Sequence, residues 1–303
     1  MPTNADTDAD YGYTVAPPGF RLPAATRLGA VRLQVADLAR SIAYYEKVVG
    51  LRVLGRTATT ATLGAMSDPT PLVELHARAG VTPVPQRGRL GLYHFALLLP
   101  DRASLGRFVA HLGAIGERAG MADHLVSEAI YITDPDGLGI EVYADRPRVA
   151  WPVRGSTLGM AVDPLDTTDL VRAAGGVPWT GAPAGTRIGH VHLFVGDLDA
   201  AAALYHGALG LDRVVLDAVP GAVFLSAGGY HHHLGTNTWA ARAPVATDAD
   251  ARLLEWTIVV PTRADVEAAV TSLARAGYEA SGGVVSDPWG TRVRIVAADA
   301  ERD

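Results

Sequence analysis

The chain contains two long segments in which an apolar stretch is followed by a helix-forming stretch. RLGAVRLQVADLARSIAYYEKVVGL (27–51) and RIGHVHLFVGDLDAAAALYHGALGL (187–211) align without a gap at an offset of 160 residues. Each segment predicts a strand, an aspartate at the helix N-cap (Asp37 and Asp197) and a helix that ends at Gly-Leu. The chain therefore carries an internal repeat, and the repeat sets its organisation.

A second pair of segments repeats the strand-and-helix pattern later in each half. LYHFALLLPDRASLGRFVAHLGAIG (92–116) matches LLEWTIVVPTRADVEAAVTSLARAG (253–277). Each continues to a predicted hairpin, TDPDGLGIEVYAD (133–145) or SDPWGTRVRIVAAD (286–299), in which Asp-Pro-x-Gly supplies the turn.

The pattern predicts an α+β fold of four similar modules, each a strand and a helix followed by a few strands (βαβββ). The first to fourth modules lie near 27–78, 90–145, 187–240 and 252–299. In chain order the first two modules make one domain (27–145) and the last two make another (187–299). Residues 1–26 are predicted to be an extended arm, and the Pro-, Gly- and Thr-rich segment 146–186 is predicted to link the halves.

Composition and charge exclude several classes of protein. The formal net charge of −6 argues against a nucleic-acid surface, no run is long and apolar enough for a membrane span, and the N-terminal sequence does not predict a signal peptide. The chain has no cysteine, so any metal must be held by histidines and carboxylates, which suit Fe(II), Mn(II) or Zn(II). We expect a cytoplasmic protein that binds neither nucleic acid nor membrane, and the sequence leaves a monomer and a homo-oligomer both open.

Four βαβββ modules with the pattern V-x-D-L…Y…LGL resemble the vicinal oxygen chelate superfamily. This superfamily includes glyoxalase I, fosfomycin-resistance proteins and extradiol ring-cleaving dioxygenases. The resemblance covers about 28–145 and 187–299, and the segment GYHHHLGTNTW (229–239) is most similar to two-domain catechol 2,3-dioxygenases. It implies that two modules form a cupped sheet around one metal, with ligands from the first strand of each module and from the last strand of one or both.

The repeat alignment shows which residues occupy the implied ligand positions. The first-strand positions of the four modules are Ala30, His94, His190 and Glu255. On the last strands, Glu141 of the second module aligns with Arg294 of the fourth, and Glu74 takes this place in the first module.

Pairing the modules in chain order gives no complete ligand set, whereas pairing the second module with the third does. If the first module pairs with the second, their site has only two ligands, His94 and Glu141. If the third pairs with the fourth, Arg294 occupies a ligand position, where its positive charge would oppose a cation. Pairing the second module with the third gives His94, Glu141 and His190. The first and fourth modules then form a degenerate pair with Glu255 and Arg294. Fosfomycin-resistance proteins exchange modules between subunits in this way, and a tandem fusion would do so within one chain.

Two histidines and one carboxylate on one face of an ion form the facial triad of non-haem Fe(II) oxygenases. The resemblance therefore implies an Fe(II)-dependent extradiol dioxygenase, with a catechol-like aromatic diol and O2 as substrates. Mn(II) and Zn(II) are the alternative metals.

The resemblance also implies residues that act beside the metal. Tyr131 and His124 lie where extradiol enzymes keep a tyrosine and a histidine, and the triplet 231–233 lies where they place the acid–base histidine. The triplet is predicted near the end of a strand, so alternation directs either His232 or His233 towards the substrate and the other away. His192 shares the strand face of His190 and is predicted to contact the substrate.

Two other functions remain open from the sequence. The first is another metal-dependent lyase, isomerase or thiol transferase of the superfamily, in which a fourth ligand at the last strand of the third module would fall near His232 or His233. The second is a non-catalytic binder of a drug or aromatic ligand, against which an intact metal triad argues.

Overall fold

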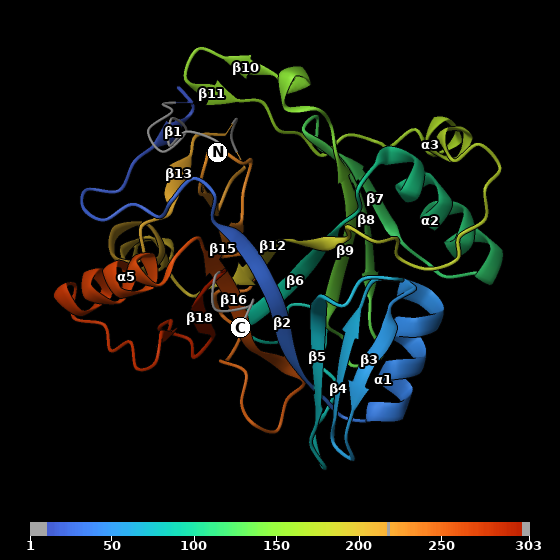
Figure 1. Cartoon of the computed structure of the whole chain (residues 1–303), viewed down its shortest axis with the longest axis horizontal. Helices are drawn as coiled ribbons and strands as arrows, with labels where there is room; N and C mark the ends of the chain where they lie inside the picture. The colour runs from blue at the N-terminus through green and yellow to red at the C-terminus, as the bar shows by residue number, and fades with distance from the viewer. Residues whose placement is uncertain (1–10, 217–218, 299–303) are drawn as a thin grey trace.

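The computed structural model describes residues 11–216 and 219–298, which form two curved sheets with helices packed against them (Figure 1). Within these ranges one sheet has nine strands and the other has seven. The nine-stranded sheet runs, in spatial order, β1 (Thr14–Val15), β13 (Asp212–Val214), β14 (Ala222–Ser226), β15 (Leu234–Asn237), β12 (Arg187–Phe194), β6 (Gly91–Leu98), β9 (Gly139–Asp145), β8 (Ser127–Thr133) and β7 (Gly120–Asp123). The seven-stranded sheet runs β17 (Val284–Ser286), β18 (Arg292–Ala297), β16 (Arg252–Val260), β2 (Arg27–Val35), β5 (Pro71–Ala77), β4 (Thr60–Gly64) and β3 (Arg52–Arg56).

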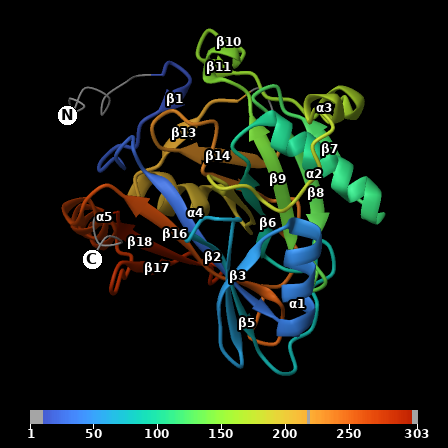
Figure 2. The same ribbon diagram turned by 45° about the vertical axis from the view of Figure 1, so that its right-hand side comes forward.

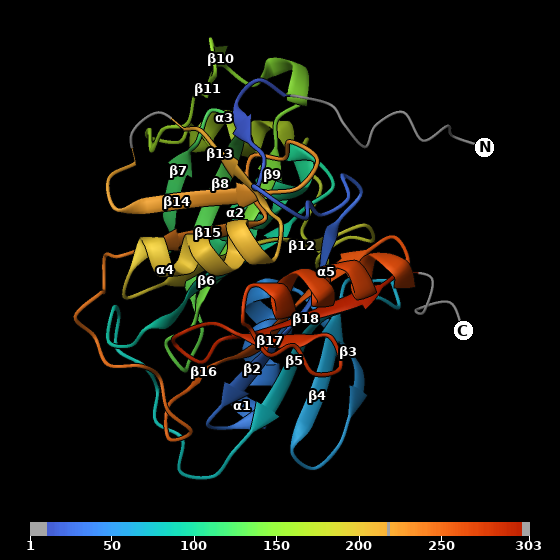
Figure 3. The ribbon, with the colours of Figure 1, turned by 90° about the vertical axis from the view of Figure 1, so that its left-hand side faces the viewer.

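The strand order confirms the predicted exchange of modules. The second and third modules share the nine-stranded sheet through the antiparallel pair β6–β12, and the first and fourth share the other sheet through β2–β16. Figure 3 shows the green and gold elements together in one half and the blue and red elements in the other. Each sheet thus takes one module from 27–145 and one from 187–299. The fourth module has two named strands after its helix, where the repeat predicts three.

The helices begin where the sequence places their caps. Asp37 accepts a hydrogen bond from the Arg40 backbone N–H, and Asp197 accepts one from that of Ala200. Each satisfies an N–H group that the first helical turn leaves without a partner. The helices are α1 (Leu38–Tyr44), α2 (Arg102–Ile115), α3 (Thr167–Ala173), α4 (Leu198–Ala202) and α5 (Arg263–Arg275), with π-helical turns η1 (Tyr45–Val49) after α1 and η3 (Ala203–Ala208) after α4 and a 3-10 turn η2 (Arg148–Ala150).

Modules that are neighbours in sequence still contact one another, through helices and turns. The buried Tyr45 hydroxyl of η1 donates to Asp134 in the turn of the second module, at 3.3 Å. The buried Tyr205 hydroxyl of η3 donates to Asp287 in the turn of the fourth module, at 3.0 Å. The repeat therefore preserves a helix-to-turn contact within each half, while the sheets join the halves.

The segment 146–186, predicted as a linker, contains its own short elements. It holds η2, the hairpin β10 (Val153–Arg154) and β11 (Thr157–Leu158), and α3, which packs against α2 (Figure 2). A Cβ atom added at Gly106 of α2 would lie 2.2 Å from the Leu170 carbonyl oxygen of α3, so this contact requires glycine.

The described part of the predicted N-terminal arm lies against the third module. Strand β1 pairs with β13, the Tyr13 hydroxyl donates to the Gly229 carbonyl at 2.8 Å, and Arg21 pairs with the buried Asp212 at 2.7 Å. Residues 1–10 of the predicted arm and residue 299 of the second predicted domain lie outside the described residues. Over the described ranges, no helix has both the length and the apolarity needed to cross a membrane.

Candidate metal site and its surroundings

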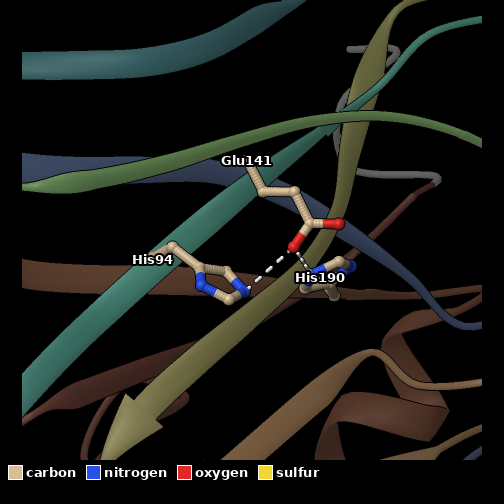
Figure 4. A group of neighbouring side chains, drawn as sticks. All are labelled: His94, Glu141 and His190. Carbon is tan, nitrogen blue, oxygen red and sulfur yellow. Dashed lines mark hydrogen bonds and ion pairs between the residues drawn. The ribbon is translucent and has the colours of Figure 1, made fainter. Parts of the chain in front are cut away.

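His94, Glu141 and His190 meet on one face of the nine-stranded sheet, as the repeat predicts (Figure 4). They come from three adjacent strands, β6, β9 and β12. Side chains alternate along a strand, so Phe95 and Leu97 point into the hydrophobic core while His94 and Ala96 face the opposite side. Strand pairing therefore brings together three side chains that are far apart in sequence.

The geometry of these three residues fits a metal ion. The Nε2 atoms of His94 and His190 each lie 3.1 Å from the same oxygen, Oε2 of Glu141, and the three donor atoms all lie within 4.8 Å of one another. Adjacent ligands bonded at about 2.1 Å lie about 3 Å apart. All three side chains are buried, and neither ring nitrogen of His94 nor Nδ1 of His190 has a hydrogen-bond partner among the described residues.

His94 and Glu141 favour the protonation states of metal ligands. Burial lowers the pKa of His94, which favours its neutral form. Burial alone would raise the pKa of Glu141, but the charge and hydrogen bonds of His190 and His94 outweigh it and hold that pKa well below its usual value. Neutral imidazoles and an ionised carboxylate are the forms that bind a cation.

The strand register leaves the fourth ligand position without a donor. In the second module, Glu141 lies opposite Ala96, the residue two positions after His94. The equivalent position in the third module is the one opposite His192, two positions after His190, and Gly235 occupies it. The expectation that this position falls near His232 or His233 is wrong, because β15 begins only at Leu234. A Cβ atom at Gly235 would lie 2.8 Å from Cγ of His192, so the His192 ring occupies that space.

His192 is buried on the sheet face of the metal site. Its Nε2 lies 2.9 Å from Nδ2 of Asn237, and its ring centroid lies 5.1 Å from that of His94 and 5.2 Å from that of Tyr93. Burial holds the pKa of His192 well below its usual value, so the ring is neutral and accepts a hydrogen bond from the Asn237 amide.

The equivalent position of the other sheet holds an ion-pair network. The strand register places Glu74 opposite Arg32. It places Arg294 opposite Thr257, which lies two residues after Glu255, and both placements agree with the repeat alignment. Arg294 binds the buried Glu255 through two nitrogens, at 2.7 and 3.2 Å. A guanidinium group therefore supplies the positive charge beside this carboxylate.

Tyr131 and His124 form a pair beside the triad. Tyr131 lies directly opposite Glu141 in the β8–β9 register, and its hydroxyl lies 2.6 Å from Nε2 of His124. Nδ1 of His124 lies 2.6 Å from the Ala161 carbonyl, which accepts only, so Nδ1 carries a proton and, in the neutral ring, Nε2 accepts from the tyrosine. Burial, with the nearby Glu141 charge, raises the pKa of Tyr131 well above its usual value, so the hydroxyl keeps its proton.

The histidine triplet lies before β15, and the prediction that it lies near the end of a strand is wrong. All three rings are buried, so none is turned to solvent. The His232 ring lies 4.1 Å from that of His190, centroid to centroid, whereas Nδ1 of His233 accepts from the Ala227 backbone N–H at 3.1 Å. Of the two predicted candidates, His232 is therefore the one packed against a triad residue.

Two residues near the triad were not identified from the sequence. Nε2 of His231 lies 2.9 Å from Oδ1 of Asp145, and Nδ1 of His231 lies 2.8 Å from Nδ1 of His232. Asp145 lies four residues after Glu141 on β9, so the strand period would have placed both on one face. The strand period gives no position for the loop that carries His231 and His232, so the contact of His231 with Asp145 could not be predicted.

A cavity of about 530 Å³ reaches the triad on one side. His94 and Tyr131 form its inner end, and the aromatic rings of Tyr93 and Phe194 line its wall. Its volume falls in the range of small-molecule sites, roughly 300–1,000 Å³.

The family model of the Glyoxalase/Bleomycin resistance protein/Dioxygenase superfamily matches residues 27–142 and 187–302. The chain belongs to this superfamily, which confirms the resemblance seen in its sequence. More particularly, it is 42% identical over 255 residues to a catechol-2,3-dioxygenase of Bacillus subtilis (strain 168), with 84% of this chain and 89% of that protein aligned.

Solved structures share the fold at much lower sequence identity. A protein of Bacillus subtilis subsp. subtilis str. 168 that carries a provisional description as a dioxygenase has a TM-score of 0.61 at 15% identity, over 89% of this chain and 84% of its own. Glyoxalase I from Zea mays has a TM-score of 0.53 at 19% identity, over 89% of this chain and 92% of its own. These likenesses confirm the predicted fold.

Proposed function

We propose that the protein is an Fe(II)-dependent extradiol dioxygenase that cleaves the ring of a catechol-like diol with O2. The observation that carries this proposal is the buried set His94, Glu141 and His190, with Gly235 where a fourth ligand would lie. Three protein ligands leave adjacent positions on the ion for other groups, which is the arrangement of the facial triad. The similarity to a catechol-2,3-dioxygenase supports this choice of reaction.

Fe(II) held by this triad would supply the positions at which the two diol oxygens and O2 bind, and it would pass electron density from the diol to O2. The protein must hold the diol ring and handle its protons. The cavity wall of Tyr93 and Phe194 offers flat apolar surfaces for an aromatic ring beside His94.

His232 is the residue that would accept a diol proton. Its ring is buried against His190 and Phe224, with centroid distances of 4.1 and 5.0 Å. A base packed against a triad residue would be close to a group bound there, as general base catalysis requires.

Tyr131 and His124 would act on the other side of the triad. The Tyr131 hydroxyl is a hydrogen-bond donor held by His124, and it lines the cavity beside His94. When the His124 ring is protonated, its Nε2–H would donate to the Tyr131 oxygen, and the hydroxyl proton would then be free to donate to an oxygen of the bound reactants. His192 would contact the substrate from the third module.

The proposal is tested by metal analysis together with O2 uptake. Protein purified anaerobically should carry about one Fe(II) per chain, because one triad is formed per chain, and it should consume O2 with catechols to give a yellow ring-fission product. Stoichiometric zinc with no O2 uptake across a catechol panel would refute the dioxygenase and favour another metal-dependent enzyme of the superfamily.

Variants of the two sheets test which residues hold the metal. His94→Ala, Glu141→Ala and His190→Ala should each abolish metal binding, whereas Glu255→Ala and Arg294→Ala serve as matched controls from the ion-pair network and should retain it. Loss of metal in the control variants would show that the assigned site is wrong.

A further inference from the structure

A chain of hydrogen bonds leads from Asp145 to the ring packed on the triad. Oδ1 of Asp145 lies 2.9 Å from Nε2 of His231, and Nδ1 of His231 lies 2.8 Å from Nδ1 of His232. His231 is fully buried, while the Asp145 side chain is 23% exposed. The chain therefore connects a partly exposed carboxylate with the buried His232.

The chemistry of these groups determines where the protons lie. An ionised carboxylate only accepts hydrogen bonds, so Nε2 of His231 carries a proton and donates to Asp145. In the neutral ring, Nδ1 of His231 is then an acceptor, so Nδ1 of His232 must donate to it. His232 is left with its proton on Nδ1 and a lone pair on Nε2.

We propose that Asp145 and His231 are positioning residues that fix the tautomer and the ring orientation of His232. Their effect on catalysis depends on the function proposed above, in which His232 accepts a diol proton. Nε2 is the nitrogen that the chain leaves free to do so. The arrangement corresponds to the way an aspartate sets the tautomer of a histidine base in serine hydrolases, with one more imidazole between them.

Asp145 is held rigidly enough for this task. Its second oxygen, Oδ2, accepts from the Tyr230 hydroxyl at 3.0 Å, and the Tyr230 hydroxyl in turn lies 2.6 Å from that of Tyr143. Tyr143 fits because its neighbour is Gly189, where a Cβ atom would lie 1.8 Å from the Tyr143 hydroxyl. Strand β9 therefore carries both the ligand Glu141 and Asp145, so one rigid element positions the metal and the orienting carboxylate.

The tautomer of His232 can be measured directly. Long-range 1H–15N correlation spectra of histidine-labelled protein, loaded with diamagnetic Zn(II), distinguish the two ring nitrogens without any activity measurement. The expected result is a proton on Nδ1 of His232. A proton on Nε2 in the unaltered protein would overturn the proposal.

Asp145→Asn should reverse the positions of the protons along this chain of hydrogen bonds, because asparagine has nearly the shape of aspartate but can donate. The amide oxygen would accept from Tyr230, the amide N–H would face His231, and the protons along the chain would shift so that His232 carries its proton on Nε2. Under the proposed function kcat should fall about 10–100-fold. This is smaller than the rate enhancement of roughly 10²–10⁴-fold that a general base supplies, because His232 itself remains. KM and metal content should stay within about twofold, because positioning of a base affects the proton-transfer step rather than substrate binding.

His231→Gln gives a second, independent variant. It removes the link between Asp145 and His232, and it should lower kcat in the same way while metal content is kept. His206→Gln is the control for the same substitution at another hydrogen-bonded imidazole, because Nδ1 of His206 bonds the Leu211 carbonyl and His206 lies outside the site. An unchanged tautomer and unchanged kcat in Asp145→Asn would overturn the proposal. Absence of O2 uptake in the unaltered protein, with the expected tautomer present, would instead refute only the proposed function.

Discussion

The Tyr131 hydroxyl lies 2.6 Å from Nε2 of His124, which is itself held by the Ala161 carbonyl at 2.6 Å. Tyr131 belongs to β8 and lines the cavity, whereas Ala161 belongs to the segment predicted as a linker. The connecting segment therefore fixes the orientation of a group beside the candidate metal site.

This relationship predicts that Tyr131→Phe lowers kcat about 10–100-fold without loss of metal, because the ring packing remains and only the hydroxyl that links His124 to the site is removed. His124→Gln should have a similar effect. The double variant should be hardly worse than either single one, since residues that act as a unit are not additive. Tyr44→Phe, which removes a hydroxyl bonded to the Thr133 carbonyl and not to a triad residue or His124, is the control. Additive losses in steady-state O2 uptake would show that the pair does not act as a unit.

Gly235 should not tolerate a side chain. Its added Cβ atom would lie 2.8 Å from Cγ of His192. Gly235→Ala should therefore displace this ring, lower kcat/KM and destabilise the protein by about 1–3 kcal/mol through overpacking. The double variant His192→Ala with Gly235→Ala should recover much of the stability, because the clash is gone. Chemical denaturation of Gly235→Ala, His192→Ala and the double variant measures the coupling, and no recovery in the double variant would contradict it.

Arg294 should stabilise the fold but have no part in metal binding. Arg294→Ala leaves Glu255 buried with only the more distant Arg32 and Arg292, at 3.5 and 3.3 Å. Since Arg294 is about one-third exposed, the loss should be about 1–3 kcal/mol, below that of a fully buried pair. Replacing Glu255 and Arg294 together with glutamine should cost less than Arg294→Ala alone. Denaturation curves and metal content of both variants test this, and an equal or larger loss in the double variant would contradict it.

Asp134 should make the stability depend on pH. Burial raises its pKa to about 7, although the backbone N–H groups of Leu138 and Asp136 lower it, and its closest ionisable neighbours are Asp136 and Tyr45. The folded state thus binds this proton more tightly than the unfolded chain, so the favourable contribution is fully present below about pH 4 and is lost as the pH rises to about 7.

Asp134→Asn should remove this loss, because the amide still accepts from the same two N–H groups and cannot ionise. A shift of about 3 pKa units corresponds to about 4 kcal/mol. The measurement is the free energy of unfolding of both proteins, with metal content matched, at pH 5 and pH 8. The difference between variant and unaltered protein should grow towards pH 8, and a constant difference would contradict the assignment.

The repeat predicted most of the fold, and together with the ligand positions that the superfamily resemblance implies it predicted the three triad residues. Its gapless alignment identified the equivalent first-strand positions, and the chemistry of Ala30, Glu255 and Arg294 disfavoured the chain-order pairing of modules relative to the one observed. This was possible because equivalent strand positions in a repeat face the same way, so a ligand set can be listed without coordinates. The caps at Asp37 and Asp197 were equally local and were predicted correctly.

Tertiary structure decided the features that depend on where strands begin and on how loops pack. Because β15 begins only at Leu234, Gly235 occupies the position of a fourth ligand. The histidine triplet therefore lies in a loop, where the alternation of side chains along a strand does not apply. The contacts of His231 with Asp145 and of His124 with Ala161 join residues 86 and 37 positions apart through irregular backbone. No sequence period relates such residues. Only the folded chain shows that the sheet shared by the second and third modules brings them close to His94, Glu141 and His190.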